Sequence, residues 1–433
     1  MKNNKIYNKT IYFLFLSALT LLFWYYGLDF LGISLFVIAS FFVLIIRKNA
    51  IHTLPFLLNM LFMISRTEWS LDTIPNYLYI LPIILLIGFI IHYFKFKEKV
   101  KKGRLTYPLL LMVLAMFFSI YNTNIFDINY IFYLVIGIFY IAIYLFFIQS
   151  IKGKNLNYLL RLFACLGVLI SLQVLLFYLR SENILNAIES KEIDLGWGIS
   201  NFVATYLIVF ISSTVYFLKH SKYKIVFAFI ITFELFMLLF TLSRGGILAF
   251  IAVLPLLIIY LFYEYQNKKQ MVLYTIIIIV LLSGIIYTNT SYFVPIWERF
   301  IKLTDQHLAR IDLWKEALVK FKDNPIFGAG LFARVEDDYF GFYHNTVMHT
   351  LATLGIIGFI SLIWQGIIVF IVFLKNYNPE KIILLIALIG ANIHGLVDNV
   401  YYMPQFMILF FVIIAVVEIS NRNSLPVIKI WMV

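Results

Sequence analysis

The stretch Tyr343–Phe359, YHNTVMHTLATLGIIGF, changes from polar to apolar within a few residues. It opens with a His-Asn pair and a second histidine, and the sequence beyond it stays apolar to about residue 374. A helix that crosses a bilayer needs roughly 20 such residues. We therefore predict a membrane-spanning helix at 346–374 whose N-terminal end carries hydrogen-bonding side chains.

The whole chain has the composition of a membrane protein. Hydrophobic residues make up 63% of its 433 residues, charged residues make up 13%, and the mean hydropathy is +0.93. Soluble domains are about half apolar and a quarter charged. The sequence therefore predicts an all-α polytopic fold. Fourteen spans are expected, at 11–28, 30–46, 51–65, 73–94, 106–121, 130–149, 157–179, 201–218, 223–242, 245–262, 271–288, 346–374, 381–396 and 402–419.

The spans at 30–46 and 51–65 are short for a crossing, and twelve crossings remain if they form a hairpin that stays in one leaflet. We divide the chain into N-terminal transmembrane helices at 1–240, a second membrane domain at 241–420 and a tail at 421–433. The turn at 180–200 is acidic and could form a short interfacial helix.

Basic residues are spread unevenly between the two sides of the predicted bundle. The chain has 34 Lys and Arg against 22 Asp and Glu, a formal net charge of +12. With the N-terminus inside, most of the basic residues fall in inner connections, as the positive-inside rule describes. Both termini are therefore predicted to be cytoplasmic. The positive charge is attributed to the membrane surface, and no nucleic-acid partner is expected.

The long external loop at 289–345, between spans 11 and 12, contains an expected amphipathic helix, DQHLARIDLWKEALVKFKDNP, beginning at Asp305. Its apolar residues recur every three or four positions, as on one face of a helix: Leu308, Ile311, Trp314, Leu318 and Phe321. The IFGAG segment that follows is predicted to be a flexible turn, with Gly328 and Gly330 as suitable hinges.

Polar residues gather at the predicted outer ends of the helices. Arg244 lies between two spans in TLSRGGIL, Arg310 lies on the loop helix, and His344 lies where the loop returns to the membrane. Each has an ordinary explanation when taken alone: a snorkelling arginine, a solvated surface charge and a structural histidine. Together they predict a membrane-level site with two fixed positive charges and one imidazole, the usual general base. The glycines after Arg244 are expected to let an anionic group approach it.

Three segments resemble signatures of the O-antigen ligase and polymerase superfamily. SRGGIL is similar to its Arg-x3-Leu motif through Arg244 and Leu248, and ARIDLWKEALVKFKDNPIFGAG resembles its arginine-bearing loop helix. HNTVMHTLATLGIIG is similar to its His-[Asn/Ser/Gln]-x9-Gly-x2-Gly motif through His344 and Asn345, with the glycines Gly355 and Gly358. The resemblance covers roughly 240–400. Family members commonly have about twelve spans, so fourteen imply two additional N-terminal helices.

The resemblance implies a metal-independent, cofactor-free, inverting glycosyltransferase on the outer face of a bacterial cytoplasmic membrane. The donor would be a glycan on undecaprenyl pyrophosphate, and the acceptor a glycan or a lipid-linked unit. His344 would deprotonate the acceptor while Arg244 and Arg310 stabilise the leaving pyrophosphate. Gly355 and Gly358 would allow close helix packing. Substrate contacts are expected from Ser243, Tyr343, Asn345, His349 and Asp398.

Several alternatives stay open. Polymerisation of repeat units is favoured over O-antigen ligase activity towards lipid A core, and a chain-length regulator is a candidate partner. A flippase for lipid-linked oligosaccharide is the rival of another class, but it should carry charges along several spans and paired halves. His394 and Asp398 either line the acceptor side or bond each other. Glu234 is either functional or hydrogen-bonded to a neighbouring helix.

Overall fold

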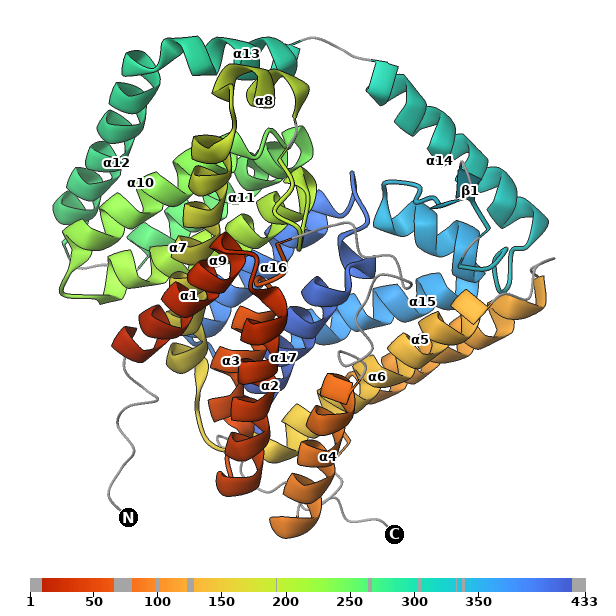
Figure 1. Ribbon diagram of the computed structural model, residues 1–433. Helices are drawn as coiled ribbons and strands as arrows, with labels where there is room; N and C mark the ends of the chain where they lie inside the picture. The colour runs from red at the N-terminus through yellow and green to blue at the C-terminus, as the bar shows by residue number, and fades with distance from the viewer. Residues whose placement is uncertain are drawn as a thin grey trace.

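The structure is a computed structural model that describes residues 10–65, 80–97, 102–122, 128–191, 193–263, 267–301, 305–331, 333–336 and 339–422. Nearly all of these residues are helical (Figure 1). The α-helices are α1 Thr10–Tyr25, α2 Asp29–Ile46, α3 Leu54–Met60, α4 Ile80–Lys95, α5 Thr106–Ser119, α6 Ile128–Ser150, α7 Leu156–Arg180, α8 Ile184–Ser190, α9 Ser200–His220, α10 Lys224–Phe240, α11 Arg244–Phe262, α12 Lys268–Thr288, α13 Thr290–Ile301, α14 Asp305–Asp323, α15 Thr346–Leu374, α16 Pro379–His394 and α17 Pro404–Arg422.

Short elements complete the description. The 3-10 helices are η1 Ala50–Thr53, η3 Ile120–Asn122 and η4 Val400–Tyr402. Strands β1 Val335–Glu336 and β2 Tyr339–Phe340 form one antiparallel hairpin. The all-α class is therefore confirmed apart from this hairpin, and α8 forms the short helix expected in the acidic turn.

The predicted count of fourteen spans is not confirmed. Within the described residues, seven helices are long and apolar enough to cross a membrane. They are α2, α7, α9, α11, α12, α15 and α17. Every predicted span contains a helix, but several of these helices are shorter than predicted. Two segments lie outside the described residues. They are 66–79, which includes the beginning of the predicted fourth span, and 423–433, which is most of the tail.

The predicted spans 2 and 3 form a hairpin that runs the length of α2. The helical part of the second arm, Ala50–Met60, would rise only about 16 Å at 1.5 Å per residue. The chain continues without a helix to Ser65, whose backbone N–H donates to Asp29 Oδ2 at the start of α2 (2.8 Å). Phe62 on this irregular stretch is fully buried, and its carbonyl accepts from Gln173 Nε2 (2.8 Å). Irregular backbone is tolerated at membrane depth when protein covers it.

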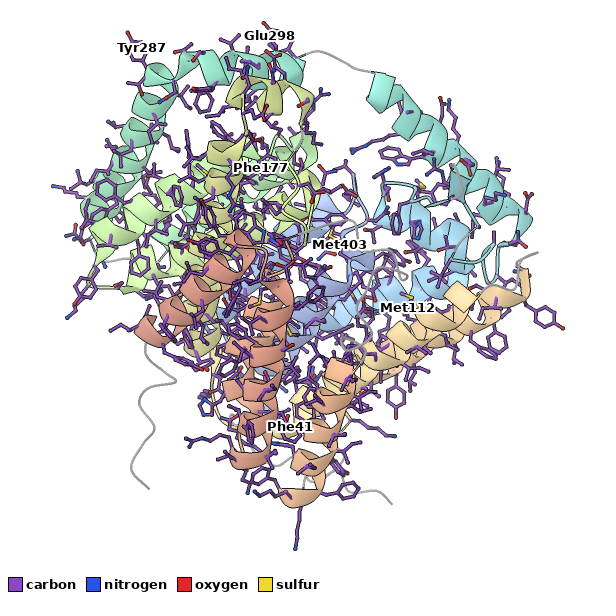
Figure 2. All side chains as sticks on the ribbon, viewed as in Figure 1. Phe41, Met112, Phe177, Tyr287, Glu298 and Met403 are labelled. Atoms are coloured by element: carbon purple, nitrogen blue, oxygen red, sulfur yellow. The ribbon has the colours of Figure 1, made fainter. Side chains whose placement is uncertain are left out.

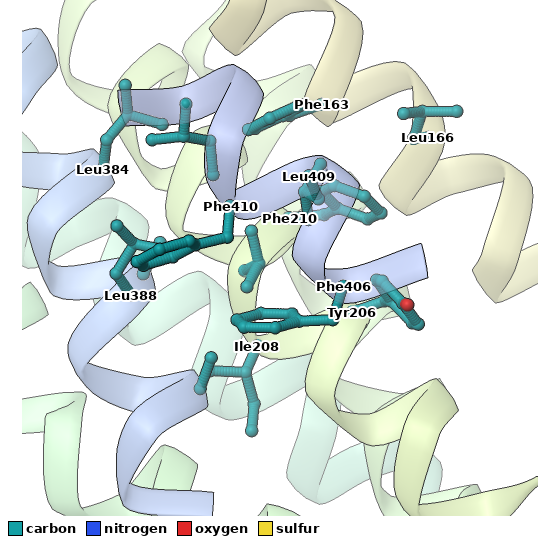
Figure 3. Close-up of a cluster of buried hydrophobic side chains, with 14 of the residues drawn as sticks. Phe163, Leu166, Tyr206, Ile208, Phe210, Leu384, Leu388, Phe406, Leu409 and Phe410 are labelled. Carbon is teal, nitrogen blue, oxygen red and sulfur yellow. The ribbon is translucent and has the colours of Figure 1, made fainter. Parts of the chain in front are cut away.

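Helix α9 forms the centre of the core. It packs against α7, α10, α11 and α16. Of its 18 most apolar consecutive residues, 89% are buried. Figure 3 shows side chains of α7, α9, α16 and α17 interlocking around Tyr206 and Phe210. Because α9 is enclosed by its neighbours, its N-terminal end is a fixed base on which other polar segments converge.

Helix α15 is broken at Gly355. This residue has φ +61° and ψ −161°, a left-handed conformation that favours glycine. A Cβ added to Gly355 would lie 2.4 Å from the Ile326 carbonyl oxygen, so glycine is needed for the close approach as well. The break leaves backbone groups without helical partners, and Pro325 and Ile326 supply them. Their carbonyls accept from the N–H groups of Ile356 (2.9 Å) and Ile357 (3.2 Å).

The IFGAG segment forms the predicted turn, and it takes part in the hydrogen bonding of α15. Its flexibility and the hinge role of its glycines stay predictions. The N–H of Gly330 donates to the Thr353 carbonyl at 3.0 Å. A Cβ on Gly328 would lie 2.2 Å from the carbonyl carbon of Thr353. Asn122 Nδ2 also donates to the Gly328 carbonyl (2.8 Å), which ties the segment to the end of α5.

The predicted loop helix is confirmed as α14, but its contact face differs from the predicted stripe. Trp314 and Ala317 face α15, and Trp314 Nε1 donates to the Tyr343 carbonyl (3.0 Å). Ile311 and Leu318 are instead 46% and 41% exposed. The side chain of Leu308 lies outside the described residues. The contact face instead includes Leu313 and Ala317, which pack in one cluster with Tyr343, Met348 and Ala352.

Candidate active site

His344 occupies the last turn before α15 begins. Its φ is +45°, an uncommon left-handed conformation for a residue with a side chain. Asn345 follows it as the N-cap of α15, accepting from the N–H groups of Val347 (2.9 Å) and Met348 (3.0 Å). The Asn345 Nδ2 donates to the Leu396 carbonyl (2.7 Å). Both polar ends of Asn345 thus make hydrogen bonds within the fold, and its contact with substrate stays a prediction.

The imidazole of His344 faces a carboxylate. His344 Nδ1 lies 3.5 Å from Asp398 Oδ1, a charge contact longer than a good hydrogen bond. The histidine side chain is 42% exposed, whereas that of Asp398 is 5% exposed. Burial raises the pKa of Asp398, but the imidazoles of His344 and His394 and the backbone N–H of Asn399 outweigh it and lower this pKa overall. The buried, charged carboxylate of Asp398 therefore lies next to the accessible imidazole of His344.

Asn201, in the first turn of α9, connects this pair to the arginine motif. Its Nδ2 donates to Asp398 Oδ2 (2.5 Å), and its Oδ1 accepts from Ser243 Oγ (2.8 Å). Ser243 is the N-cap of α11 and accepts from the Gly246 N–H (3.1 Å). Arg244, half-buried, is the first residue of α11. One amide thus bridges the segments that carry Arg244 and His344.

No sequence motif singles out Asn201. Its partners are 42 and 197 positions away in the chain, so no local spacing reveals them. The only signal was its place as a polar residue at the predicted outer end of a span.

More positive charge surrounds the Asn201 bridge. Lys191, at the end of α8, has its Nζ 3.4 Å from Asn201 Oδ1. Arg310 is half-buried on α14, close enough for its charge to act on His394. His394 Nδ1 is hydrogen-bonded to Thr205 Oγ1 (2.8 Å). Of the two alternatives for His394 and Asp398, mutual bonding is therefore not what the structure shows. Lys191 and Arg310 therefore add positive charge near Asn201 and His394.

Two predicted substrate contacts are buried elsewhere. Tyr343 is fully buried, and its hydroxyl lies 3.4 Å from Glu316 Oε1 on α14. His349 is 1% exposed and packs edge-on against Tyr402, with ring centroids 4.5 Å apart. Both residues secure the loop and α15. Glu234 accepts from Thr214 Oγ1 on α9 (3.0 Å), the structural alternative left open for it.

A cavity of about 420 Å³ begins at His344 and continues between helices. Its polar end is lined by Asn201, His344, Asp398 and Asn399. Much of its remaining wall comes from the apolar faces of α5, α6 and α17: Leu109, Met112, Val113, Met116, Gly137, Tyr140, Pro404, Met407 and Phe411. The rest of the lining consists of Ile199, Phe202, Phe342, Tyr401, Tyr402 and Met403. Met403 and Met112 are both near the middle of the molecule in Figure 2. The cavity is suited to a molecule with one polar end and a long apolar part.

Asn399 adds an unused donor to the polar end. Its Oδ1 accepts from the backbone N–H of Asn345 (3.2 Å). Its Nδ2 is buried and has no hydrogen-bond partner among the described residues. A buried amide without a partner is expensive, so a ligand oxygen in the cavity would stabilise it.

The glycines after Arg244 allow close helix packing. A Cβ on Gly245 would lie 2.6 Å from Val397 Cγ2, and one on Gly246 would lie 2.5 Å from Ala204 Cβ. They bring the start of α11 close to α9 and the end of α16. This close packing places the start of α11 beside the Asn201 bridge, and the approach of an anion to Arg244 stays a prediction.

Comparison with known families identifies this region. Residues 226–363 match the family model described as O-antigen ligase. This segment, about a third of the chain, is similar to the O-antigen ligase family. The matched segment contains Arg244, Arg310 and His344, whereas Asn201 and Asp398 come from outside it.

The chain is also similar to a protein of Haemophilus influenzae described as uncharacterized. The two are 27% identical over 241 residues, which is 49% of this chain and 59% of that protein. The chain spans less than two thirds of that protein's length. The match at 226–363 and the long apolar helices indicate a multi-pass membrane protein with an O-antigen ligase-like region.

Proposed function

We propose that this protein polymerises oligosaccharide repeat units carried on undecaprenyl pyrophosphate, at the outer face of the bacterial cytoplasmic membrane. The observation that carries the proposal is the His344–Asp398 pair at the polar end of a cavity whose other walls are apolar. The cavity can hold an isoprenoid segment between α5, α6 and α17 while its pyrophosphate stays near His344. The orientation rests on the positive-inside pattern.

In the proposed reaction, His344 acts as the general base. Its Nδ1 faces Asp398, so its Nε2 accepts the proton of the attacking sugar hydroxyl. The hydroxyl oxygen forms a bond to the anomeric carbon as the bond from that carbon to the pyrophosphate oxygen breaks. One displacement inverts the anomeric centre, and Asp398 stabilises the imidazolium that forms. No metal or cofactor is part of the proposal.

The departing pyrophosphate gains negative charge as this bond breaks. Arg244 and Arg310 are proposed to stabilise it, because fixed guanidinium groups bind phosphate oxygens in two-pronged geometry. Lys191 adds a third cation in the same region. Fixed charges in a site that excludes bulk water stabilise a developing anion more than they would in water.

The alternative within the superfamily is transfer of the finished glycan to lipid A core or another acceptor. The matched family model is described as O-antigen ligase, which favours it. The structure offers the same base and the same cations for either acceptor.

Cells lacking the protein, complemented with wild type, His344→Ala or His52→Ala, test the proposal. His52 lies on η1, away from the candidate site, and serves as the histidine control. Lipid-linked and surface glycans are then sized on gels. We expect single repeat units with His344→Ala and long chains with wild type and His52→Ala. If long chains instead stay on undecaprenyl pyrophosphate in cells with His344→Ala, the protein is the ligase. Repeat units retained on the cytoplasmic side would indicate a flippase, and full complementation by His344→Ala would refute the assigned base.

A further inference from the structure

A second cavity, of about 700 Å³, lies at the other end of α9. Asn201 is in the first turn of this helix and His220 is its last residue. Its 21 residues separate the two cavities by roughly 30 Å at 1.5 Å per residue. The second cavity is bounded by α1, α7, the end of α9 and α10. It shares no lining residue with the cavity at His344.

Basic side chains line the second cavity. They are Arg161 on α7, His220, and Lys222 in the turn between α9 and α10. Arg161 is half-buried, and its guanidinium donates to Asn157 Oδ1 (2.7 Å) and Thr10 Oγ1 (3.3 Å). Both partners are neutral oxygens.

Arg161 forms no ion pair with a carboxylate in the part of the chain that the structure describes. The carboxylate to which hydrogen bonds connect it is Glu380. That path runs through Asn157 Nδ2, the Tyr216 hydroxyl (3.4 Å) and Glu380 Oε1 (3.3 Å). The charge of Arg161 is therefore oriented by the protein without a carboxylate in contact with it.

The other walls of the cavity are apolar and open outward. Ile11 and Leu14 of α1 are 76% and 46% exposed, and Val226 of α10 is 49% exposed. Helices α1 and α10 both pack on α7, which supplies Ala164 and Val168 to the cavity. A basic group above an apolar, outward-facing groove matches a molecule with an acidic head and a hydrocarbon chain.

We propose that this second cavity binds an anionic phospholipid of the leaflet opposite the candidate active site. The phosphate would lie against Arg161 and Lys222, and an acyl chain would follow Ile11, Leu14 and Val226 between α1 and α10. Basic pockets between transmembrane helices hold acidic headgroups in this way. A soluble phosphate ester shares the headgroup chemistry but would leave the apolar walls uncovered, so the lipid is favoured.

Native mass spectrometry of the full-length protein tests the proposal. The protein is reconstituted with equal amounts of phosphatidylglycerol and phosphatidylcholine, and the lipid retained after release is counted. Wild type should keep phosphatidylglycerol in preference. The double variant Arg161→Gln/Lys222→Gln should lose that preference by about fivefold for each basic side chain removed. Lys268→Gln/Lys269→Gln, which removes two charges at the start of α12, should retain phosphatidylglycerol like wild type.

Two further arms distinguish the remaining outcomes. Arg161→Lys keeps the charge and should retain lipid, and melting in phosphatidylcholine alone shows whether each variant is folded. Inorganic phosphate that stabilises wild type as much as phosphatidylglycerol does would overturn the lipid assignment, as would equal retention in the two double variants. His344→Ala should retain phosphatidylglycerol normally, so this proposal and the proposed function fail separately.

Discussion

Asn201 and Asp398 are 197 positions apart in the chain and are joined by a 2.5 Å hydrogen bond. The same amide accepts from Ser243 Oγ, the cap of the helix that begins with Arg244. Asp398 in turn faces His344. The base and one arginine of the proposed site are therefore positioned by one residue that belongs to neither motif.

Replacing Asn201 by Ala should slow glycan transfer by about 10- to 100-fold. A hydrogen bond to a charged group contributes about 1.5–3 kcal/mol, and the variant leaves Asp398 buried with one fewer donor. Turnover of lipid-linked substrate by purified protein, followed across pH, measures the effect. Asn186→Ala, an exposed asparagine of α8, is the matched control and should be normal. Unchanged turnover in Asn201→Ala would remove its positioning role.

Asp398→Asn should slow transfer by roughly 100-fold or more, the range of general acid–base contributions. Asn cannot stabilise the imidazolium that forms on His344. If the variant turns over like wild type, the carboxylate is not part of the mechanism. Asp312→Asn, whose side chain is 70% exposed, is the control.

The stability of wild type should also depend on acid pH through Asp398. Its pKa is lowered in the fold, so the charged form contributes stability above the unfolded value of about 3.9. That contribution is lost as pH falls through the lower folded pKa. Asp398→Asn should therefore melt below wild type at neutral pH, and the difference should begin to shrink below about pH 4 as the pH falls towards the lowered pKa of Asp398. Parallel melting curves from pH 7 to pH 3 would contradict this.

Gly355→Ala should destabilise the protein by about 1–3 kcal/mol, the usual range for a side chain forced into a strained backbone conformation. The added Cβ would also meet the Ile326 carbonyl. Gly366→Ala on the same helix is the control, because a Cβ there meets nothing within 4 Å. It should be neutral or slightly stabilising, as alanine favours helix. Thermal melting in detergent measures the stability of the two variants. Equal melting temperatures would show that the break in α15 does not require glycine at position 355.

Trp314→Phe should loosen α14 while leaving the membrane core intact. It removes one hydrogen bond to the Tyr343 carbonyl, worth about 1 kcal/mol. Limited proteolysis should cut α14 several times faster than in wild type, with little change in overall melting. Trp297→Phe on α13, a site 68% exposed, should leave the cutting rate unchanged. A cutting rate equal to wild type in Trp314→Phe would show that this contact does not hold the helix.

Much of the fold could be predicted, because apolar runs and helical spacing are local signals. The sequence placed a helix in each span and the loop helix at α14. The lengths of the membrane-spanning helices could not be predicted from these local signals. The second arm of the α2 hairpin ends as irregular backbone covered by Gln173, a residue 111 positions from its partner.

The site was predictable in its motifs but not in its roles. His344 and Asp398 come together as residues at outer helix ends should. Asn345 was assigned to substrate, yet its position before an apolar helix is also the pattern of an N-cap. Asn201 and Asn399 were missed because their partners lie far along the chain.

The break at Gly355 also bears on how the protein is made. Backbone groups at the break pair with residues 325–330, which precede α15 and follow the loop helix. In hydrocarbon, a backbone polar group without a partner is strongly unfavourable. We therefore expect the loop to be translocated and folded before α15 settles in the bilayer. Residues 325–330 would then be in place to pair with the backbone at the break as α15 enters the bilayer.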